Sequence, residues 1–167
     1  MLTSSSLNIL PLNKEDLVLY LMGDDVYEQK YSLNAWGRTI PPVMQEMMVE
    51  GTLPGIDICS PQQLYFFTLW IAIEKETASI IGEFQLKGLP DKEGWVEIGY
   101  ETFEPFQRNG YMFEMVQYMK NWAVDYGITG FIAETHQSNT PSIQLLKKMN
   151  FTPVKQEKHL IRWKCKL

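Results

Sequence analysis

The sequence has few cysteines and no long hydrophobic run, and each shortage excludes a class of protein. Its 167 residues include only Cys59 and Cys165, too few for a disulfide framework or a complete zinc site. We therefore expect a cytoplasmic protein with reduced thiols and no bound metal. The longest apolar stretches, such as Leu69–Ile73, fall far short of the roughly 18 residues that cross a membrane.

Positive charge is also scarce in this chain. Fifteen Lys and Arg stand against 20 Asp and Glu, so the net charge is −5. An acidic chain is a poor match for nucleic acid, because affinity there comes mostly from basic groups that neutralise phosphates. Residues Met1–Leu10 lack the basic start and apolar core of a secretory signal peptide. We expect neither a nucleic-acid partner nor a membrane partner.

The rest of the sequence predicts one domain over 1–167, because its length suits a single domain and no repeat or linker divides it. The N-terminal part predicts a short edge strand at Leu7–Leu12 and a helix capped by Asn13. A second helix is predicted over Thr39–Gly51. A loop is predicted over Gly51–Pro61, which is rich in Gly, Pro, Asp and Ser.

The second half of the chain predicts strands that alternate with helices, so the fold class is α+β (mixed α/β). Short turns indicate an antiparallel meander of three strands at Tyr65–Glu74, Ser79–Lys87 and Trp95–Phe103. Apolar residues then recur with helical spacing from Met112 to Tyr126. The elements predicted after this helix are a strand at Ile128–Thr135, a helix with Thr140 as its N-cap and Asn150 at its end, and one or two strands within Thr152–Cys165.

One segment between a predicted strand and a predicted helix, Pro105–Met115, has the features of an anion site. Consecutive backbone N–H groups in such a turn form a concave nest, and the helix N-terminus adds about half a positive charge. Gly110 permits a backbone angle or a close approach that a Cβ would block. A phosphate group fits this pattern, and so does an ordinary strand-to-helix turn with one glycine.

The common phosphate and nucleophile motifs are absent, because the chain contains no GxxxxGK, GxGxxG or GxSxG sequence. It does contain a turn of the Q-x-x-G-x-x type at Gln107–Met112 and, further on, NTPSIQLLKKMNF at Asn139–Phe151. With IIGEFQLKG (Ile80–Gly88) and VEIGY (Val96–Tyr100), these motifs resemble the GNAT family of N-acetyltransferases. Within that family, the chain is similar to the ribosomal-protein N-terminal acetyltransferase-like subgroup, over nearly its whole length.

The resemblance implies a fold and a co-substrate. The fold would be a mostly antiparallel, splayed sheet of about six to seven strands with about four helices. The pyrophosphate of acetyl-CoA would bind to the turn formed by Gln107, Arg108, Asn109, Gly110, Tyr111 and Met112. The pantetheine arm would lie in the gap between two strands, beside Tyr100, Thr102, Phe103, Asn139 and Ser142.

Two departures from the family pattern bear on activity. The family prefers a small residue where this chain has Met112, although a side chain that points away from the nest leaves the N–H groups usable. A common family position for a general-acid tyrosine is Leu146 here. The alternative function is therefore a catalytically idle acyl-CoA-binding or regulatory domain of the same fold.

Transfer of an acetyl group to a primary amine by direct attack in a ternary complex needs a neutral nucleophile, and therefore a base. Glu134 is the first candidate, because some family members use this position, five residues before Asn139. His136 is the second candidate, and an exposed loop imidazole is the alternative interpretation. Glu101 lies on the neighbouring predicted strand on one face with Glu97, which fits a structural role better.

The amine acceptor would be held by the N-terminal helices and the loop Gly51–Pro61. Trp36, Met47, Met48 and Tyr65 would either line that site or belong to the core. The acidic residues of the N-terminal half favour a cationic acceptor, such as a peptide N-terminus, a small amine or an aminoglycoside. Homodimers are common in the family that the chain resembles, so a homodimer is one possible assembly.

Overall fold

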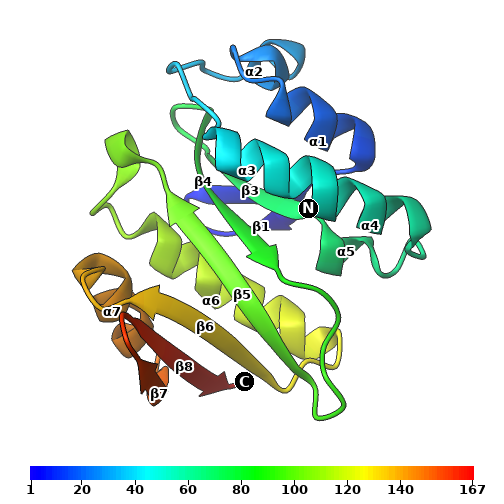
Figure 1. The fold of residues 1–167 in the computed structure, drawn as a ribbon. Helices are drawn as coiled ribbons and strands as arrows, with labels where there is room; N and C mark the ends of the chain where they lie inside the picture. The colour runs from blue at the N-terminus through cyan, green and yellow to red at the C-terminus, as the bar shows by residue number, and fades with distance from the viewer.

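A computed structural model describes all 167 residues, Met1–Leu167, as a single eight-stranded sheet with helices on both faces (Figure 1). The strand order is β1-β2-β3-β4-β5-β6-β8-β7. Only β5 and β6 pair in parallel, and the other neighbours are antiparallel. The strands are β1 (Leu2–Thr3), β2 (Leu7–Pro11), β3 (Leu69–Glu74), β4 (Ser79–Leu86), β5 (Trp95–Thr102), β6 (Gly130–His136), β7 (Thr152–Glu157) and β8 (Leu160–Lys166).

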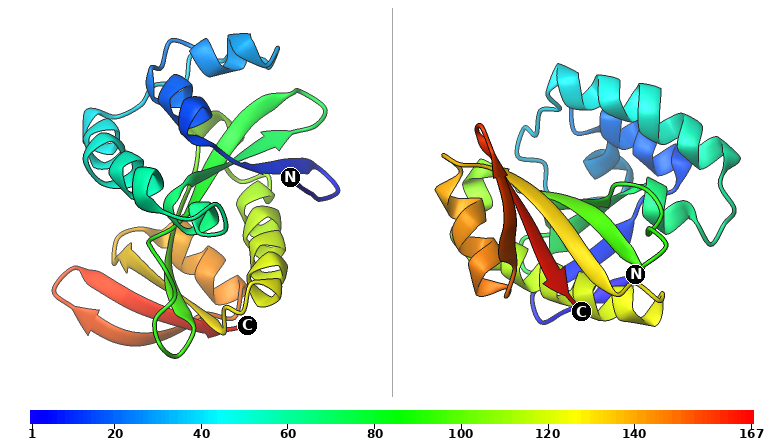
Figure 2. Two further views of the ribbon diagram at one scale, coloured as in Figure 1. Left: turned by 90° about the vertical axis from the view of Figure 1, so that its right-hand side faces the viewer. Right: turned by 60° about the horizontal axis from the view of Figure 1, so that its bottom comes forward.

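The helices form two layers, one on each face of the sheet (Figure 2). On one side lie α1 (Lys14–Leu21), α2 (Val26–Lys30), α3 (Pro42–Met47) and α4 (Leu53–Ile58). The short α5 (Leu64–Phe67) follows α4, and its aromatic side chains pack in the core on the opposite side. On the other side lie α6 (Tyr111–Asp125) and α7 (Thr140–Lys148). No helix is both long enough and apolar enough to cross a membrane.

Each face of the sheet has its own hydrophobic core. The larger core includes Trp70 and Phe84 and packs under α6 and α7, while the smaller one includes Ile71 and packs under α1 and α2. The two cores share β3 because successive side chains of a strand point to opposite faces. Apolar residues on both faces therefore make β3 the near-continuous hydrophobic run seen in the sequence.

Several N-terminal predictions are wrong. The predicted loop over Gly51–Pro61 is largely helical, because a π-helical turn at Met48–Thr52 continues α3 into α4. Pro54 does not prevent this, since a proline fits the first turn of a helix. The segment predicted as a strand from Tyr65 begins instead as α5.

The strand and helix counts also exceed the prediction, with eight strands and seven α-helices. The extra strand, β1, is two residues long and pairs outside β2, so Leu7–Pro11 is an interior strand and not the predicted edge. A two-residue strand and the five-residue α2 are too short to leave a periodic pattern in the sequence.

Two predicted helix starts hold, with one change of capping residue, whereas the helix predicted from Thr39 begins at Pro42. The side chain of Asn13 accepts a hydrogen bond from the Asp16 N–H at 2.8 Å, as predicted. At α7 the cap is Asn139 and not Thr140, because the Asn139 amide oxygen accepts from the Ser142 N–H at 3.2 Å. Asn150 ends α7 in the left-handed conformation, with φ of 64°.

The parallel pair at the centre of the sheet is short. β5 and β6 pair only where Trp95–Ile98 lies opposite Gly130–Ala133. Beyond that point β5 continues to Thr102 and β6 to His136, each still paired with its antiparallel partner on the other side. The two strands therefore diverge (Figure 1), which confirms the splayed sheet implied by the resemblance.

A substitution at Gly82 of β4 can test how closely the backbones of β4 and β5 approach each other. A Cβ added at Gly82 would lie 2.4 Å from the backbone oxygen of Glu101 and 3.2 Å from the Met112 methyl group. We expect Gly82→Ala to lower the free energy of unfolding by about 1–3 kcal/mol, the usual cost of overpacking. Urea denaturation measures it.

The control for this substitution is Gly51→Ala, because no atom lies within 4 Å of a Cβ added there. Alanine is also the better helix former, so this variant should be unchanged or slightly more stable. Equal losses of stability in both variants would contradict the close β4–β5 contact.

Candidate functional site

The turn between β5 and α6 presents an uninterrupted row of backbone donors. None of the six N–H groups from Arg108 to Phe113 donates a hydrogen bond to another group of the protein. Three of them belong to the first turn of α6, where a helix leaves N–H groups without internal partners. The row of donors and the positive end of a 15-residue helix together suit an anion such as pyrophosphate.

Local sequence explains the shape of this turn. Arg108 and Gly110 both have left-handed backbones, with φ of 66° and 83°, which turns the successive N–H groups toward one side. Side chains brace the turn: the Gln107 amide donates to the Thr102 carbonyl at 3.1 Å, and the Asn109 amide donates to the Phe106 carbonyl at 3.2 Å. These two predicted ligands therefore support the backbone, and the donors are the N–H groups.

The first turn of α6 is also tied to the N-terminal hairpin. The Glu114 carboxylate accepts hydrogen bonds from the Ser5 hydroxyl at 2.9 Å and from the Ser6 hydroxyl at 2.6 Å. Burial opposes ionisation of Glu114, but the donors of this serine segment outweigh it and lower its pKa to about 2. An ionised carboxylate near a helix N-terminus is favourable, and this one fixes where the helix begins.

The space between the diverging strands is bridged by one hydrogen bond. The Tyr100 hydroxyl of β5 lies 2.8 Å from the Ser142 hydroxyl in the first turn of α7. Burial raises the pKa of Tyr100 to about 12, so the phenol stays protonated at neutral pH. Tyr100, Ser142 and Asn139, which the sequence predicted together, do lie together at the split.

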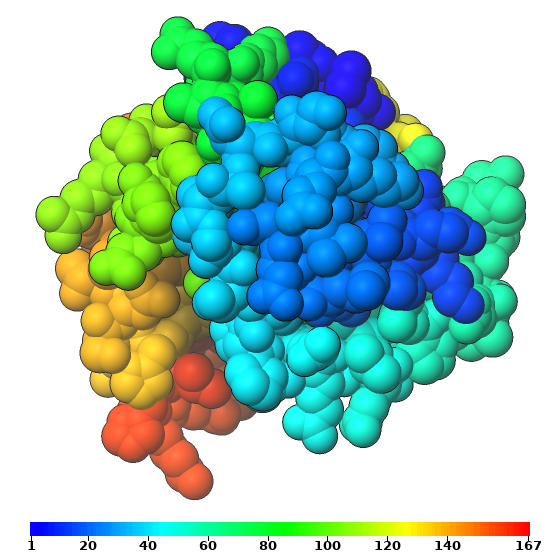
Figure 3. Space-filling view, turned by 90° about the horizontal axis from the view of Figure 1, so that it is seen from above, coloured from blue at the N-terminus to red at the C-terminus, as the bar shows by residue number.

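A cavity of about 210 Å³ opens over β4 and β5, on the side of the sheet that carries α3. Its polar lining is Glu83, Gln85, Lys87 and Glu101, and Met44 of α3 and Leu69 of β3 contribute apolar surface. Seen from above, the N-terminal half (blue to cyan) meets the segments near residues 100–110 and 140 (yellow-green and orange) along a furrow (Figure 3).

Two carboxylates of this cavity lie directly opposite each other. Glu83 of β4 is paired in register with Glu101 of β5, so both side chains leave the same face of the sheet. Glu83 is only 5% exposed. Burial raises the pKa of Glu83 to about 7, the Glu101 charge adds to the rise, and a hydrogen bond from Tyr20 opposes it.

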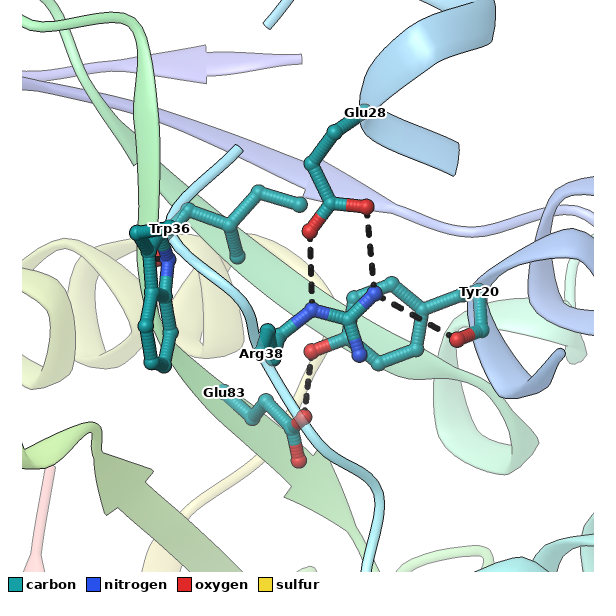
Figure 4. Close-up of polar contacts among 6 residues, drawn as sticks. Tyr20, Glu28, Trp36, Arg38 and Glu83 are labelled. Atoms are coloured by element: carbon teal, nitrogen blue, oxygen red, sulfur yellow. Dashed lines mark hydrogen bonds and ion pairs between the residues drawn. The ribbon is translucent and has the colours of Figure 1, made fainter. Parts of the chain in front are cut away.

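Glu83 also belongs to a buried polar cluster that extends from the sheet to α2 (Figure 4). The Tyr20 phenol of α1 donates to the Glu83 carboxylate. The Arg38 guanidinium lies 3.7 Å from the centre of the Tyr20 ring and is paired with Glu28 at 2.9 Å. Arg38 and Glu28 are 2% and 0% exposed.

Trp36 connects the segment that carries Arg38 to the anion turn. Its ring packs against Phe103 and Phe106, with ring centres 5.3 and 5.5 Å apart, immediately before the Gln107–Met112 turn. Its indole N–H donates to the Ile80 carbonyl at 3.0 Å. Of the residues expected to line an acceptor site, Trp36 lies beside the donor turn and is not among the cavity-lining residues, whereas Met48 is buried in the smaller core.

The other predicted bases lie elsewhere. Glu134 is exposed on β6, and its carboxylate forms an ion pair with Arg162 at 3.1 Å. His136 is also exposed, with Nδ1 2.6 Å from the Ser138 hydroxyl and its ring stacked on His159. Neither lines the cavity, whereas Glu101 does.

Sequence reasoning missed Glu83, Tyr20 and Arg38. Glu83 left a signal, because it is the only charged residue of the mainly apolar strand SIIGEFQL and charged residues are seldom buried without a reason. Tyr20 and Arg38 left none, since one resembles a core residue of α1 and the other lies in an irregular segment.

The side chains at the two departures from the family pattern both point into the core. Met112 is 6% exposed and packs in the larger hydrophobic cluster, so it does not obstruct the donor turn, as predicted. Leu146 is 1% exposed in the same cluster. No proton donor therefore comes from that position of α7.

The comparisons with known proteins agree with this geometry. A model of the family described as "Acetyltransferase (GNAT) domain" matches residues 6–152. The chain is 33% identical over 86 residues to the uncharacterized N-acetyltransferase YjdG of Bacillus subtilis (strain 168), a match that covers 51% of each chain. The chain thus spans about half the length of the curated relatives it matches.

Solved structures share the fold. The ribosomal-protein-S5-alanine acetyltransferase from Vibrio fischeri superposes with a TM-score of 0.71 at 13% identity, covering 99% of this chain and 95% of that one. RimL, a ribosomal L7/L12 alpha-N-protein acetyltransferase solved in complex with coenzyme A, superposes with a TM-score of 0.68 at 15% identity, covering 98% and 96%.

The divergent β5 and β6, with a row of backbone donors where the next helix begins, thus place this chain among proteins with the acetyltransferase fold. More particularly, the chain belongs to the GNAT domain family. This confirms the family that the Gln107–Met112 and Asn139–Phe151 motifs predicted.

The raised pKa of Glu83 predicts a pH-dependent cost in stability. Glu83 titrates near 7 when folded but near 4.5 when unfolded, so the folded state loses stability as the pH rises between these values. Glu83→Gln removes this loss and keeps an acceptor for Tyr20. We expect the variant to be more stable than wild type by up to about 3 kcal/mol at pH 8, and equal to it below pH ~4.5.

Urea denaturation at several pH values measures this difference. The control is Glu97→Gln, because Glu97 lies on the neighbouring strand β5 but pairs with Lys87 at 2.7 Å. That variant should gain no stability at pH 8. A constant difference between Glu83→Gln and wild type from pH 5 to pH 8 would contradict a raised pKa.

Proposed function

We propose that this chain is an N-acetyltransferase that moves the acetyl group of acetyl-CoA to a primary amine by direct attack in a ternary complex. One observation carries the proposal. The stretch Gly99–Glu101 of β5 borders the split on one side and the cavity on the other. A thioester held in the split and an amine held in the cavity would therefore meet beside the same stretch of β5.

The residues at the split suit acetyl-CoA, which would supply an activated acetyl thioester. The donors of Arg108–Phe113 would hold the pyrophosphate, in agreement with their lack of other partners. The part of β5 beyond Ile98 has no strand partner on the β6 side, so its backbone is available to the pantetheine amides. Asn139 and Ser142 would border that arm from α7.

Glu83 is the base that the geometry favours. It lines the cavity, and its pKa of about 7 lets it accept a proton near neutral pH without being protonated permanently. Glu101, opposite in register, would hold a cationic amine before its proton is removed. Glu134 and His136, the first choices from the sequence, remain a second hypothesis.

The pKa of Glu83 also indicates the acceptor. Removing a proton from an α-ammonium group, with pKa about 7.7–8.0, to a base of pKa about 7 is uphill by roughly one unit, or about 1.4 kcal/mol. A lysine side chain, with pKa about 10.4, would require more than three units. A peptide N-terminus or another weakly basic amine is therefore favoured over lysine.

The alternative of an idle acyl-CoA-binding domain keeps one observation in its favour. Leu146 leaves no phenol where the family commonly has a general acid. This loss is tolerable because the leaving thiolate, with pKa near that of cysteine at about 8.5, needs little assistance. The Tyr100 and Ser142 hydroxyl groups also lie at the split.

The assembly and the location of the protein stay proposals. We keep the cytoplasm as the location, because two cysteines, one of them buried in the core, are typical of chains that fold without disulfides. A homodimer stays one possible assembly, and sedimentation of the purified chain measures it.

Replacement of the base gives the main kinetic test. Wild-type kcat/KM should rise with pH through about 7, because only ionised Glu83 accepts a proton. Glu83→Gln should lower kcat/KM by about 10²–10⁴-fold and abolish that dependence. The measurement is thiol release from acetyl-CoA over a panel of peptides and small amines.

The matched comparison is Glu134→Gln, which should keep both the rate and the pH profile. If Glu134→Gln loses the pH dependence and Glu83→Gln retains it, Glu134 is the base. Tight binding of acetyl-CoA without thiol release from any amine would favour the idle domain.

The donor turn has its own test in acetyl-CoA affinity. We expect Gly110→Ala to raise the Kd by about tenfold, the value of one charge-assisted hydrogen bond, because alanine is strained at φ of 83° and distorts the donor row. Calorimetry measures it. Gly127→Ala is the control, since Gly127 follows the same helix at φ of 75°, far from the turn. Equal effects in both variants would contradict the proposed pyrophosphate site.

A further inference from the structure

Tyr20 holds one oxygen of the Glu83 carboxylate and leaves the other free. Its phenol, which is completely buried, donates to Oε1 of Glu83. Oε2 accepts no hydrogen bond from the protein, although the side chain lines the cavity. One oxygen of the Glu83 carboxylate thus accepts from Tyr20 (Figure 4), and the other is available to the cavity.

The Tyr20 ring is itself held in place. The Arg38 guanidinium stacks on the ring at 3.7 Å, and its Nη2 donates to the backbone carbonyl of Tyr20 at 3.4 Å. Arg38 is fixed in turn by Glu28, whose two oxygens accept from Nε at 2.9 Å and from Nη2 at 3.3 Å. A buried ion pair joined by two hydrogen bonds has little freedom to move.

The ion pair between Arg38 and Glu28 also determines which carboxylate neutralises the guanidinium. The charge of Arg38 is matched by Glu28 and not by Glu83. Had the guanidinium bonded Glu83 directly, the carboxylate would be a counter-ion and a weak base. With Glu28 in place, Arg38 supports the ring and the only bond to Glu83 comes from a neutral phenol.

We propose that Tyr20 is a positioning residue that orients Glu83 toward the cavity, and that Arg38, neutralised by Glu28, locks the Tyr20 ring for this purpose. The inference rests on the proposed role of Glu83 as the base. It assigns a purpose to the buried Tyr20–Arg38–Glu28 cluster, which otherwise has none beyond packing.

The proposal predicts the direction of a pKa change. Burial raises the pKa of Glu83, and the Tyr20 hydrogen bond lowers it because the bond favours the ionised carboxylate. Tyr20→Phe keeps the ring and removes only that bond, so the pKa should rise by about one unit. The charged and titratable groups that face Glu83 are Tyr20 of α1, Arg38 with Glu28 behind it, Glu101 of β5, and Lys87 of the same cavity, which is paired with Glu97.

The experiment is a carbon-13 NMR titration of the Glu83 carboxyl group, assigned by its absence in Glu83→Gln. The matched control is Tyr27→Phe, because Tyr27 packs edge-on against Tyr20 at 5.8 Å and makes no hydrogen bond to Glu83. We expect the titration of Tyr20→Phe to move upward by about one unit. That of Tyr27→Phe should stay at the wild-type value. An unchanged midpoint in Tyr20→Phe, or equal shifts in both variants, would overturn the proposal.

A second variant keeps the test decisive if Tyr20→Phe does not fold. Incorporation of 3-fluorotyrosine at position 20 retains the hydroxyl group and strengthens its donation, so the Glu83 midpoint should move downward. A midpoint that does not move overturns the proposal.

The pH profile of kcat/KM then distinguishes the role of Glu83 as the base from the role of Tyr20 as its positioning residue. If Glu83 is the base, the acid limb of Tyr20→Phe follows the NMR midpoint upward, and activity recovers at high pH. A limb that persists in Glu83→Gln would overturn the role of Glu83 as base. A limb that vanishes in Glu83→Gln but stays unmoved in Tyr20→Phe would overturn only the role of Tyr20.

Discussion

The early end of the β5–β6 pair is the constraint on which the rest of the site depends. A parallel pair would normally continue for the length of both strands, but this one stops after Ile98 and Ala133. The strands stay ordered beyond that point because each is bonded to an antiparallel neighbour on its outer side. The divergence therefore leaves strand edges available for binding without loosening the sheet. It also places Tyr100 where its hydroxyl can reach α7.

The sequence could predict the elements that depend on local chemistry, and it missed those that depend on distant contacts. The Asn13 cap, the helix that follows Gly110 and the left-handed Asn150 each follow from a few adjacent residues. The donor turn follows likewise from one glycine between a strand and a helix. Glu83 and Tyr20, in contrast, are 63 positions apart, and no local pattern indicates that they meet. Family spacing points first to Glu134 of β6 as the base, because the sequence alone offers no other guide to which carboxylates share a cavity.

The local placement of charged and polar groups, and not the net charge of the chain, explains which ligands each surface suits. The chain carries a net charge of −5, yet the expected anion would meet backbone donors, whose attraction does not depend on basic side chains. The acidic groups that remain include the register-matched pair Glu83 of β4 and Glu101 of β5. The surface suited to phosphate, at the start of α6, is thus formed by other residues than the surface suited to a cation, on β4 and β5. This arrangement would keep the two substrates from competing for one site.

The buried cluster shows why the proposed base, Glu83, is costly for the fold. A carboxylate with a pKa of about 7 is one whose ionised form the folded protein disfavours. Pairing Arg38 with Glu83 would remove that penalty, but it would also hold the carboxylate as a counter-ion. The chain instead buries a second carboxylate, Glu28, to accept the guanidinium. Two buried carboxylates where one would satisfy the charge are an arrangement that stability alone does not favour, and the proposed role of Glu83 as the base would account for it.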